Sequence, residues 1–216
     1  MKVYFSLKVG QFIKRFIMAD VALFAGWGFL DPLFSVFIIN EIAGASLVTI
    51  GAVVSIYWIL KSLIQIPVAL FLDKTNGEKD DFYVLIGAIV LLGIAAFGLT
   101  LATKVWHIYF IQILKAVAFG LYIPAYTSLF SHHLDKGHFS LDWSLDSTSV
   151  GLAMGVTGFF GGVIVTAFGY DAVFVIAGIF SFVSAAILIT VPKMVLPPPS
   201  KVKPFIKDHT PVNINQ

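Results

Sequence analysis

Long apolar runs separated by short polar stretches dominate the chain. Six segments are apolar over about twenty residues or more: 16–39, 47–72, 82–102, 106–130, 147–168 and 172–191. A helix needs about 20 such residues to cross the ~30 Å hydrocarbon layer of a membrane. The pattern therefore predicts an all-α membrane protein with six transmembrane helices.

The stretch between the second and third segments is the most polar part of this region. Six of the nine residues from Asp73 to Asp81 are charged, whereas only 12% of all residues are. Because this many charged residues cannot lie in hydrocarbon, we expect a short water-exposed turn between two spans.

Lysine and arginine are distributed unevenly over the connections. With a cytoplasmic N-terminus, eleven of the fourteen lie in cytoplasmic segments and Lys104 alone lies outside. This positive-inside asymmetry predicts a multi-pass protein of the cell membrane with both termini in the cytoplasm. The remaining two, Lys61 and Lys115, fall inside spans, where a charge is costly and needs a partner or water.

Composition adds little beyond the membrane assignment. Hydrophobic residues make up 58% of the chain and the mean hydropathy is +0.93. The chain has no cysteine, which excludes thiolate metal sites, and its net charge of +2 gives no reason to expect nucleic acid as a partner. No cofactor or metal is expected. We divide the chain into a basic amphipathic segment (1–15), a transmembrane domain (16–192) and a cytoplasmic tail rich in proline and lysine (193–216).

The polarity of the spans suggests that they form a repeating unit of three helices. The third and sixth contain no charged residue, so they can face lipid. Gly28, Pro32 and Phe34 in the first span match Gly120, Pro124 and Tyr126 in the fourth, 92 residues later. The first and fourth spans cross in opposite directions, which predicts two inverted three-helix repeats.

Two short motifs make the chain resemble one half of a major facilitator superfamily transporter. The first is Ala69-Leu-Phe-Leu-Asp73-Lys74-Thr-Asn-Gly77-Glu78-Lys79, which is similar to the family pattern Gly-x-Leu-Ala-Asp-Arg-x-Gly-Arg-Lys. It has one extra residue before the second glycine, and Ala69 and Glu78 depart from the pattern. The second is Phe168-Gly-Tyr-Asp-Ala-Val-Phe174, which is similar to Gly-Trp-Arg-x-x-Phe. The resemblance implies alternating access and a substrate cavity between two six-helix halves.

This chain supplies six spans, whereas members of that family normally have twelve. We therefore expect a homodimer of two halves, embedded in the lipid bilayer and acting on a small-molecule substrate. Another possibility is that the chain is a fragment of a longer protein. The alternative function is a non-transporting membrane scaffold that keeps the fold. An intramembrane enzyme is disfavoured because the sequence has no HExxH, GxSxG or paired-carboxylate signature.

Candidate site residues follow from polarity, position and resemblance. The substrate or coupling cavity is expected to contain Asp31, Lys61, Gln65, Gln112, Lys115 and Tyr122. The resemblance implies a conformational gate at Asp73, Lys74, Gly77 and Lys79. Close helix or dimer packing is expected at Gly151, Gly155, Gly158, Gly161 and Gly162 of the fifth span. Histidines and aspartates of the stretch 131–146 are of the residue types that could bind a metal, but a solvated loop is the preferred interpretation.

A pairing can also be predicted from depth. At 1.5 Å per residue, Asp31 lies about 12 Å and Lys115 about 13 Å below the outer boundary of their spans. An unpaired charge at that depth costs at least ~2.5 kcal/mol. We therefore expect these two side chains to pair in at least one state.

Overall fold

The computed structural model describes residues 9–74 and 78–191. Its helices are α1 (Gln11–Leu30), η1 (Asp31–Leu33), α2 (Phe34–Glu41), α3 (Leu47–Lys74), α4 (Lys79–Gly98), η2 (Leu99–Leu101), α5 (Val105–His132), α6 (Phe139–Phe168) and α7 (Tyr170–Ile189). Six helical segments are long and apolar enough to span a membrane, with α1, η1 and α2 forming one and α4 and η2 another. The predicted number, order and class of the spans are confirmed.

The boundaries of two spans differ from the prediction. Helix α6 begins at Phe139 rather than at 147, two turns earlier. Asp142 and Asp146 interrupt the apolar pattern there, yet both are buried in the bundle, where their carboxyl groups find hydrogen-bond donors. Helix α1 begins at Gln11, so it includes the last residues of the segment predicted to lie on the membrane surface. Phe12 and Ile13 of that segment are buried.

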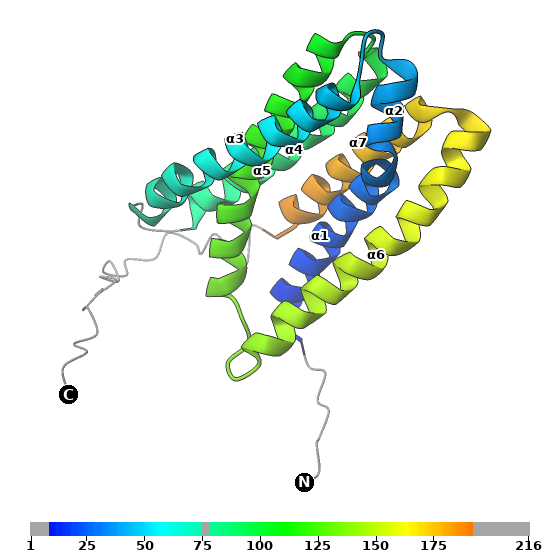
Figure 1. The fold of residues 1–216 in the computed structure, drawn as a ribbon. Coiled ribbons are helices and arrows are strands. Elements are labelled where there is room, and N and C mark those ends of the chain that lie inside the picture. Colours follow the sequence, from blue (N-terminus) through cyan, green and yellow to red (C-terminus); the bar gives the residue numbers. More distant parts are fainter. Residues whose placement is uncertain (1–8, 75–77, 192–216) are drawn as a thin grey trace, which may run out of the picture.

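The packing of the helices follows the inverted repeat. Helix α1 packs on α6 and α7, α5 packs on α3 and α4, and α4 packs on α7. Exchanging the first, second and third spans with the fourth, fifth and sixth interchanges the α1–α6 and α5–α3 contacts, interchanges the α1–α7 and α5–α4 contacts, and leaves the α4–α7 contact as it is. Figure 1 shows α1, α6 and α7 side by side, and α3, α4 and α5 beside them. The first helix of each repeat is thus held by the second and third helices of the other.

The repeated glycine occupies the same role in both repeats. A Cβ at Gly28 would lie 2.9 Å from Met154 Cα of α6, and a Cβ at Gly120 would lie 2.7 Å from Ile64 Cγ2 of α3. Both distances are too short for a side chain, so the absence of one lets α1 approach α6 and lets α5 approach α3. The 92-residue match in the sequence is therefore a match in packing as well.

Helices α3 and α6 are the least covered by the rest of the chain. Only 17% of the apolar window of α3 and 6% of that of α6 are buried, whereas 44% is buried in the segments of α4 and α7. Large apolar side chains such as Leu63 and Phe159 are exposed along them. These two faces are open to lipid or to another helix bundle.

The two ends of the bundle carry different connections. At the α1 end, where α1 begins, lie the α3–α4 and α5–α6 connections; the α2–α3, α4–α5 and α6–α7 connections lie at the opposite end (Figure 1). Gly169 makes the α6–α7 turn in a single residue with φ of +81°, a conformation that L-residues with a Cβ rarely adopt.

Candidate functional site

Asp31 stands where the first span changes from α-helix to 3₁₀-helix. The next residue, Pro32, has no backbone N–H, so the regular hydrogen-bond pattern of α1 ends at Leu30. Gly158 of α6 packs against this break, because a Cβ there would lie 3.4 Å from Pro32 Cγ. The break and its neighbour direct the Asp31 carboxylate toward α5.

Lys115 of α5 pairs with Asp31, as their depths predict. The Lys115 Nζ–Asp31 Oδ1 distance is 2.9 Å, and the exposed fraction of the side chain is 11% for Lys115 and 41% for Asp31. The ammonium also lies 4.1 Å from the Trp27 ring centroid and 5.4 Å from that of Tyr57. Phe34 and Phe119 complete the set of rings, each at 5.9 Å. Lys115 is thus held by one carboxylate and four aromatic rings.

Lys61 of α3 lies beside this pair with a different environment. Lys61 is 9% exposed, and its ammonium lies 4.3 Å from the Trp58 ring centroid and 5.5 Å from that of Tyr57. Within residues 9–74 and 78–191 it forms no ion pair. Two cation–π contacts contribute about 1–4 kcal/mol together, which is comparable to the cost of at least ~2.5 kcal/mol for a charge in hydrocarbon. The aromatic rings therefore stabilise this charge without supplying a counter-ion.

The other predicted cavity residues are distributed over two places. Gln112 is buried one turn from Lys115, and its Oε1 has no hydrogen-bond partner in the described part of the chain. Gln65 is half-buried one turn from Lys61. Tyr122 lies elsewhere: it is buried two turns further along α5, against Asp20.

A second polar cluster, which sequence reasoning missed, joins α1, α5 and α6. The Tyr122 hydroxyl donates to Asp20 Oδ1, and the Tyr126 hydroxyl donates to Asp146 Oδ1 at 2.7 Å. The two carboxyl groups also contact each other, and only 5% of Asp20 and 6% of Asp146 is exposed. The two tyrosine hydroxyls thus supply hydrogen-bond donors to a pair of neighbouring, buried carboxyl groups.

The sequence carries only a weak signal for this cluster. Asp20 lies about 6 Å inside the predicted start of its span at residue 16, at 1.5 Å per residue, which is close to the membrane surface. The structure begins the helix at Gln11, so Asp20 lies about 14 Å from the helix start. Asp146 was hidden because the fifth span was predicted to begin one residue after it.

The predicted gate residues lie on the surface of the α1 end. Asp73, Lys74 and Lys79 are exposed, and Gly77 lies outside the described residues. Nearby, Glu78 lies 3.5 Å from His132 Nδ1 and 3.5 Å from His133 Nε2. The gate carboxylate Asp73 is therefore accessible to a second bundle.

The stretch 131–146 is more ordered than the solvated loop that was expected. The Gly10 N–H donates to Asp135 Oδ2 at 2.8 Å, and the Asp135 N–H donates to Asp142 Oδ2 at 2.8 Å. These bonds tie the start of α1 to the α5–α6 connection. His133 also stacks on Phe12, with 3.7 Å between the ring centroids.

The five glycines of α6 divide into two groups. Gly158 and Gly161 pack within the chain: a Cβ at Gly161 would clash with the Phe29 carbonyl and lie 3.1 Å from its carbon. A Cβ at Gly151, Gly155 or Gly162 would meet nothing within 4 Å. Only this second group is free to contact another molecule.

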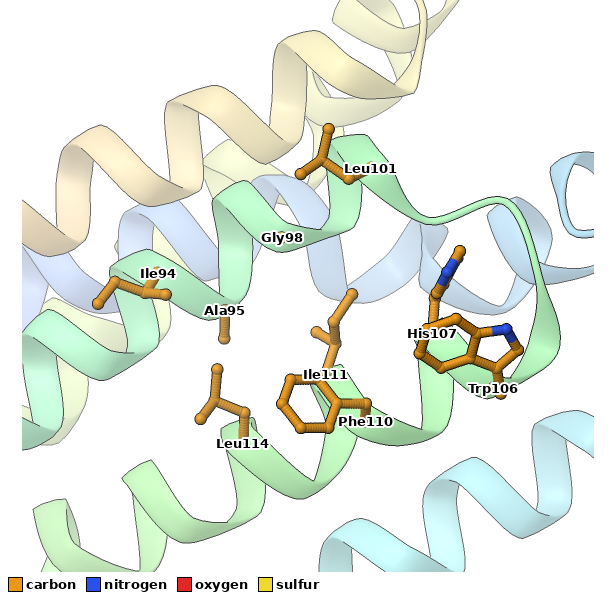
Figure 2. Close-up of a pocket in the computed structure, with 9 residues that line it drawn as sticks. All are labelled: Ile94, Ala95, Gly98, Leu101, Trp106, His107, Phe110, Ile111 and Leu114. Carbon is orange, nitrogen blue, oxygen red and sulfur yellow. The ribbon is translucent and has the colours of Figure 1, made fainter.

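The charged residues do not line the apolar groove shown in Figure 2. That groove, of about 340 Å³, lies between α4 and α5 toward the opposite end, and its lining includes Ile94, Phe110 and Trp106. His107 and Trp106 are the only described side chains of this lining that carry a nitrogen atom. Its composition suits hydrocarbon rather than a polar solute, so the ion pair and Lys61 remain the candidate solute site.

Comparison with known proteins agrees with this architecture. The family model of the Major Facilitator Superfamily matches residues 17–214. Among curated proteins, no match to the chain was found.

Proposed function

The chain belongs to the Major Facilitator Superfamily, and we propose that it is a secondary-active transporter of small solutes that works by alternating access. The observation that carries the proposal is the Lys115–Asp31 ion pair inside the membrane-spanning bundle. Its two members come from the first helices of the two inverted repeats, and transporters with inverted repeats bind substrate near the bilayer midplane at the repeat interface. A buried pair with no transport role would gain little stability over an apolar pair of the same size.

The proposal includes assembly as a homodimer. The Asp31 side chain is 41% exposed, so a polar group would face lipid if one chain worked alone. A second copy against α3 and α6 would cover the open faces and enclose the site, because these two helices flank α1 and α5. Two halves of this kind supply the twelve spans that the family resemblance implies.

We propose that the protein lies in the cell membrane and that the α1 end of the bundle faces the cytoplasm. The distribution of lysine and arginine supports this orientation, because the described connections at the α1 end contain Lys79 and Lys136, and Lys104 lies at the opposite end.

Asp73 is proposed as part of the conformational gate. In a homodimer its exposed carboxylate would meet the N-terminus of the partner's α6, which begins at Phe139. A carboxylate gains about 0.3–1 kcal/mol there. Asp73→Asn should therefore shift the dimer away from the state that is closed on the cytoplasmic side. Labelling of single cysteines near Asp31 by a membrane-impermeant maleimide would measure the shift; unchanged labelling from the cytoplasmic side would contradict it.

The transport proposal itself is tested by uptake into proteoliposomes. A metabolite library would be offered with and without a pH gradient, to wild type and to Asp31→Asn. We expect saturable uptake of at least one solute by wild type and much less by Asp31→Asn at equal protein content. A scaffold protein, the alternative function, would show no uptake and no labelling of cysteines beside Asp31 from either side.

A further inference from the structure

The solute site carries more positive than negative charge. The ammonium groups of Lys61 and Lys115 both lie over one ring, that of Tyr57, at 5.5 Å and 5.4 Å from its centroid. The single carboxylate beside them, Asp31, already pairs with Lys115. The local balance is therefore two cations against one anion.

No other described carboxylate is placed to neutralise Lys61. Asp20 and Asp146 are bound to tyrosine hydroxyls in the second cluster, and Asp81 accepts a hydrogen bond from Ser128 at the α1 end. Lys61 itself is 9% exposed, so the surrounding helices rather than water cover most of it. A buried ammonium that meets only aromatic rings would be stabilised further by a bound anion.

A third hydrogen-bond donor at this site also lacks an acceptor. The Trp27 ring, over which Lys115 lies, is buried, and its Nε1–H has no partner among the described residues. Buried donors without partners are uncommon in folded proteins. Lys61 and Trp27 therefore place two hydrogen-bond donors without an acceptor beside the ion pair.

We propose that this site binds an organic anion, a carboxylate attached to an apolar or aromatic body. The carboxylate would accept hydrogen bonds from Lys61 and, by competing with Asp31, from Lys115. The body would pack on the rings of Tyr57, Trp58 and Phe119, which lie around the two ammonium groups. The inference rests on the proposed function only in taking this site as the place where a solute binds.

Equilibrium binding tests the charge preference without requiring transport. Phenylacetate, its neutral analogue phenylacetamide and its cationic analogue phenethylammonium would be titrated into the purified full chain in lipid nanodiscs by calorimetry. Chloride and acetate would serve as small anions without a body. We expect phenylacetate to bind at least about tenfold more tightly than each of the other four, because its carboxylate makes charge-assisted hydrogen bonds. Tighter binding of either nitrogen analogue, equal binding of chloride, or no binding of phenylacetate would overturn the proposal.

Variants of Lys61 locate the effect. Lys61→Gln should weaken phenylacetate binding by about tenfold or more, whereas Lys61→Arg should keep most of it because the charge remains. Lys136→Gln, an exposed cation in the α5–α6 connection, is the matched control and should change nothing. If Lys61→Gln does not fold, the ranking of the five probes on wild type still decides the question. Binding without uptake would refute the transport proposal alone, and uptake restricted to cations or neutral solutes would refute this inference alone.

Discussion

Lys61 and Lys115 lie in the middle of membrane-spanning helices, far from the helix ends, and their surroundings differ in one group. Lys115 has Asp31 as well as aromatic rings, whereas Lys61 has the rings alone. The ion pair is held in a shared environment with Trp27 and Tyr57, so its members should be energetically coupled. At the residue scale, charge balance rather than shape distinguishes this site from the rest of the bundle.

The coupling can be measured by a double-mutant cycle. Asp31→Asn should lower the free energy of unfolding by about 1–3 kcal/mol, because it leaves the Lys115 ammonium without its carboxylate. The lower part of that range is expected, since Asp31 is partly exposed. Lys115→Gln should also destabilise, and the double variant should lose less than the sum of the two. Thermal unfolding in nanodiscs would give the three values; strictly additive losses would show that the pair is not coupled.

The carboxyl cluster predicts a second set of stability changes. Tyr126→Phe removes the hydroxyl that donates to the buried Asp146, which should cost about 1–3 kcal/mol. Tyr109→Phe on the same helix is the control, because the Tyr109 hydroxyl makes no hydrogen bond with described residues.

Asp146→Asn should be milder than Asp146→Leu, because the amide oxygen still accepts the hydrogen bond from Tyr126. Thermal unfolding in nanodiscs would compare the Tyr126, Tyr109 and Asp146 variants. Equal losses in Tyr126→Phe and Tyr109→Phe would mean that the hydrogen bond to Asp146 contributes nothing.

At the scale of the element, the repeated glycines set how closely helices approach. A Cβ at Gly28 would clash with Thr157 Oγ1 and lie 2.9 Å from Met154 Cα. A Cβ at Gly120 would lie 2.9 Å from Ile64 Cβ. Cα and Cβ atoms are fixed by the helix backbone, so they cannot yield without shifting the whole packed pair. The repeated glycine therefore resists substitution in both repeats.

Alanine substitutions should distinguish these two glycines from Gly155. Gly28→Ala and Gly120→Ala should each destabilise by about 1–3 kcal/mol through overpacking. Gly155→Ala should be neutral or stabilise by up to about 1 kcal/mol, because its Cβ meets nothing and alanine favours a helix. Unfolding of the three variants in detergent micelles would give the order; a Gly155→Ala loss as large as that of Gly28→Ala would contradict it.

The comparison of sequence and structure is also clearest for particular elements. Hydropathy predicted all six spans because a helix that crosses hydrocarbon needs about 20 predominantly apolar residues. The rise per residue of a helix predicted that Asp31 and Lys115 lie at the same depth. The start of α6 could not be predicted in this way. Asp142 and Asp146 lower the local hydropathy, and only the packed bundle shows that each accepts a hydrogen bond, from the Asp135 N–H and the Tyr126 hydroxyl respectively. Likewise, the rings around Lys61 come partly from its own helix, but its lack of a carboxylate depends on three-dimensional packing.

At the scale of the whole molecule, the six helices form one half of a symmetric arrangement. The inverted repeat fixes α1 and α5 between neighbours from the opposite repeat, and it leaves one face each of α3 and α6 open. Those faces flank the ion pair, so whatever covers them also decides how water and solute reach it. Lipid would leave Asp31 facing hydrocarbon, which is the less favourable outcome.

The proposed dimer predicts which helices meet across its two-fold axis. The chain has no cysteine, so single cysteines can be introduced at exposed positions of α3, such as Leu63 and Leu70, and of α6, such as Leu152 and Phe159. When differently tagged protomers are co-expressed, oxidation should crosslink an α3 cysteine of one with an α6 cysteine of the other, because glycines such as Gly155 leave room for close approach.

Ile94 of α4 and Ile179 of α7 provide the control, because both are exposed on helices that are not part of the proposed interface. Cysteines there should stay uncrosslinked under the same oxidation. Gly155→Leu should abolish the α3–α6 crosslinks while leaving unfolding of the protomer in detergent nearly unchanged, since nothing in the chain lies within 4 Å of that Cβ. Crosslinks that are as frequent at Ile94 and Ile179 as on α3 and α6 would show random collision in the membrane rather than a dimer with this interface.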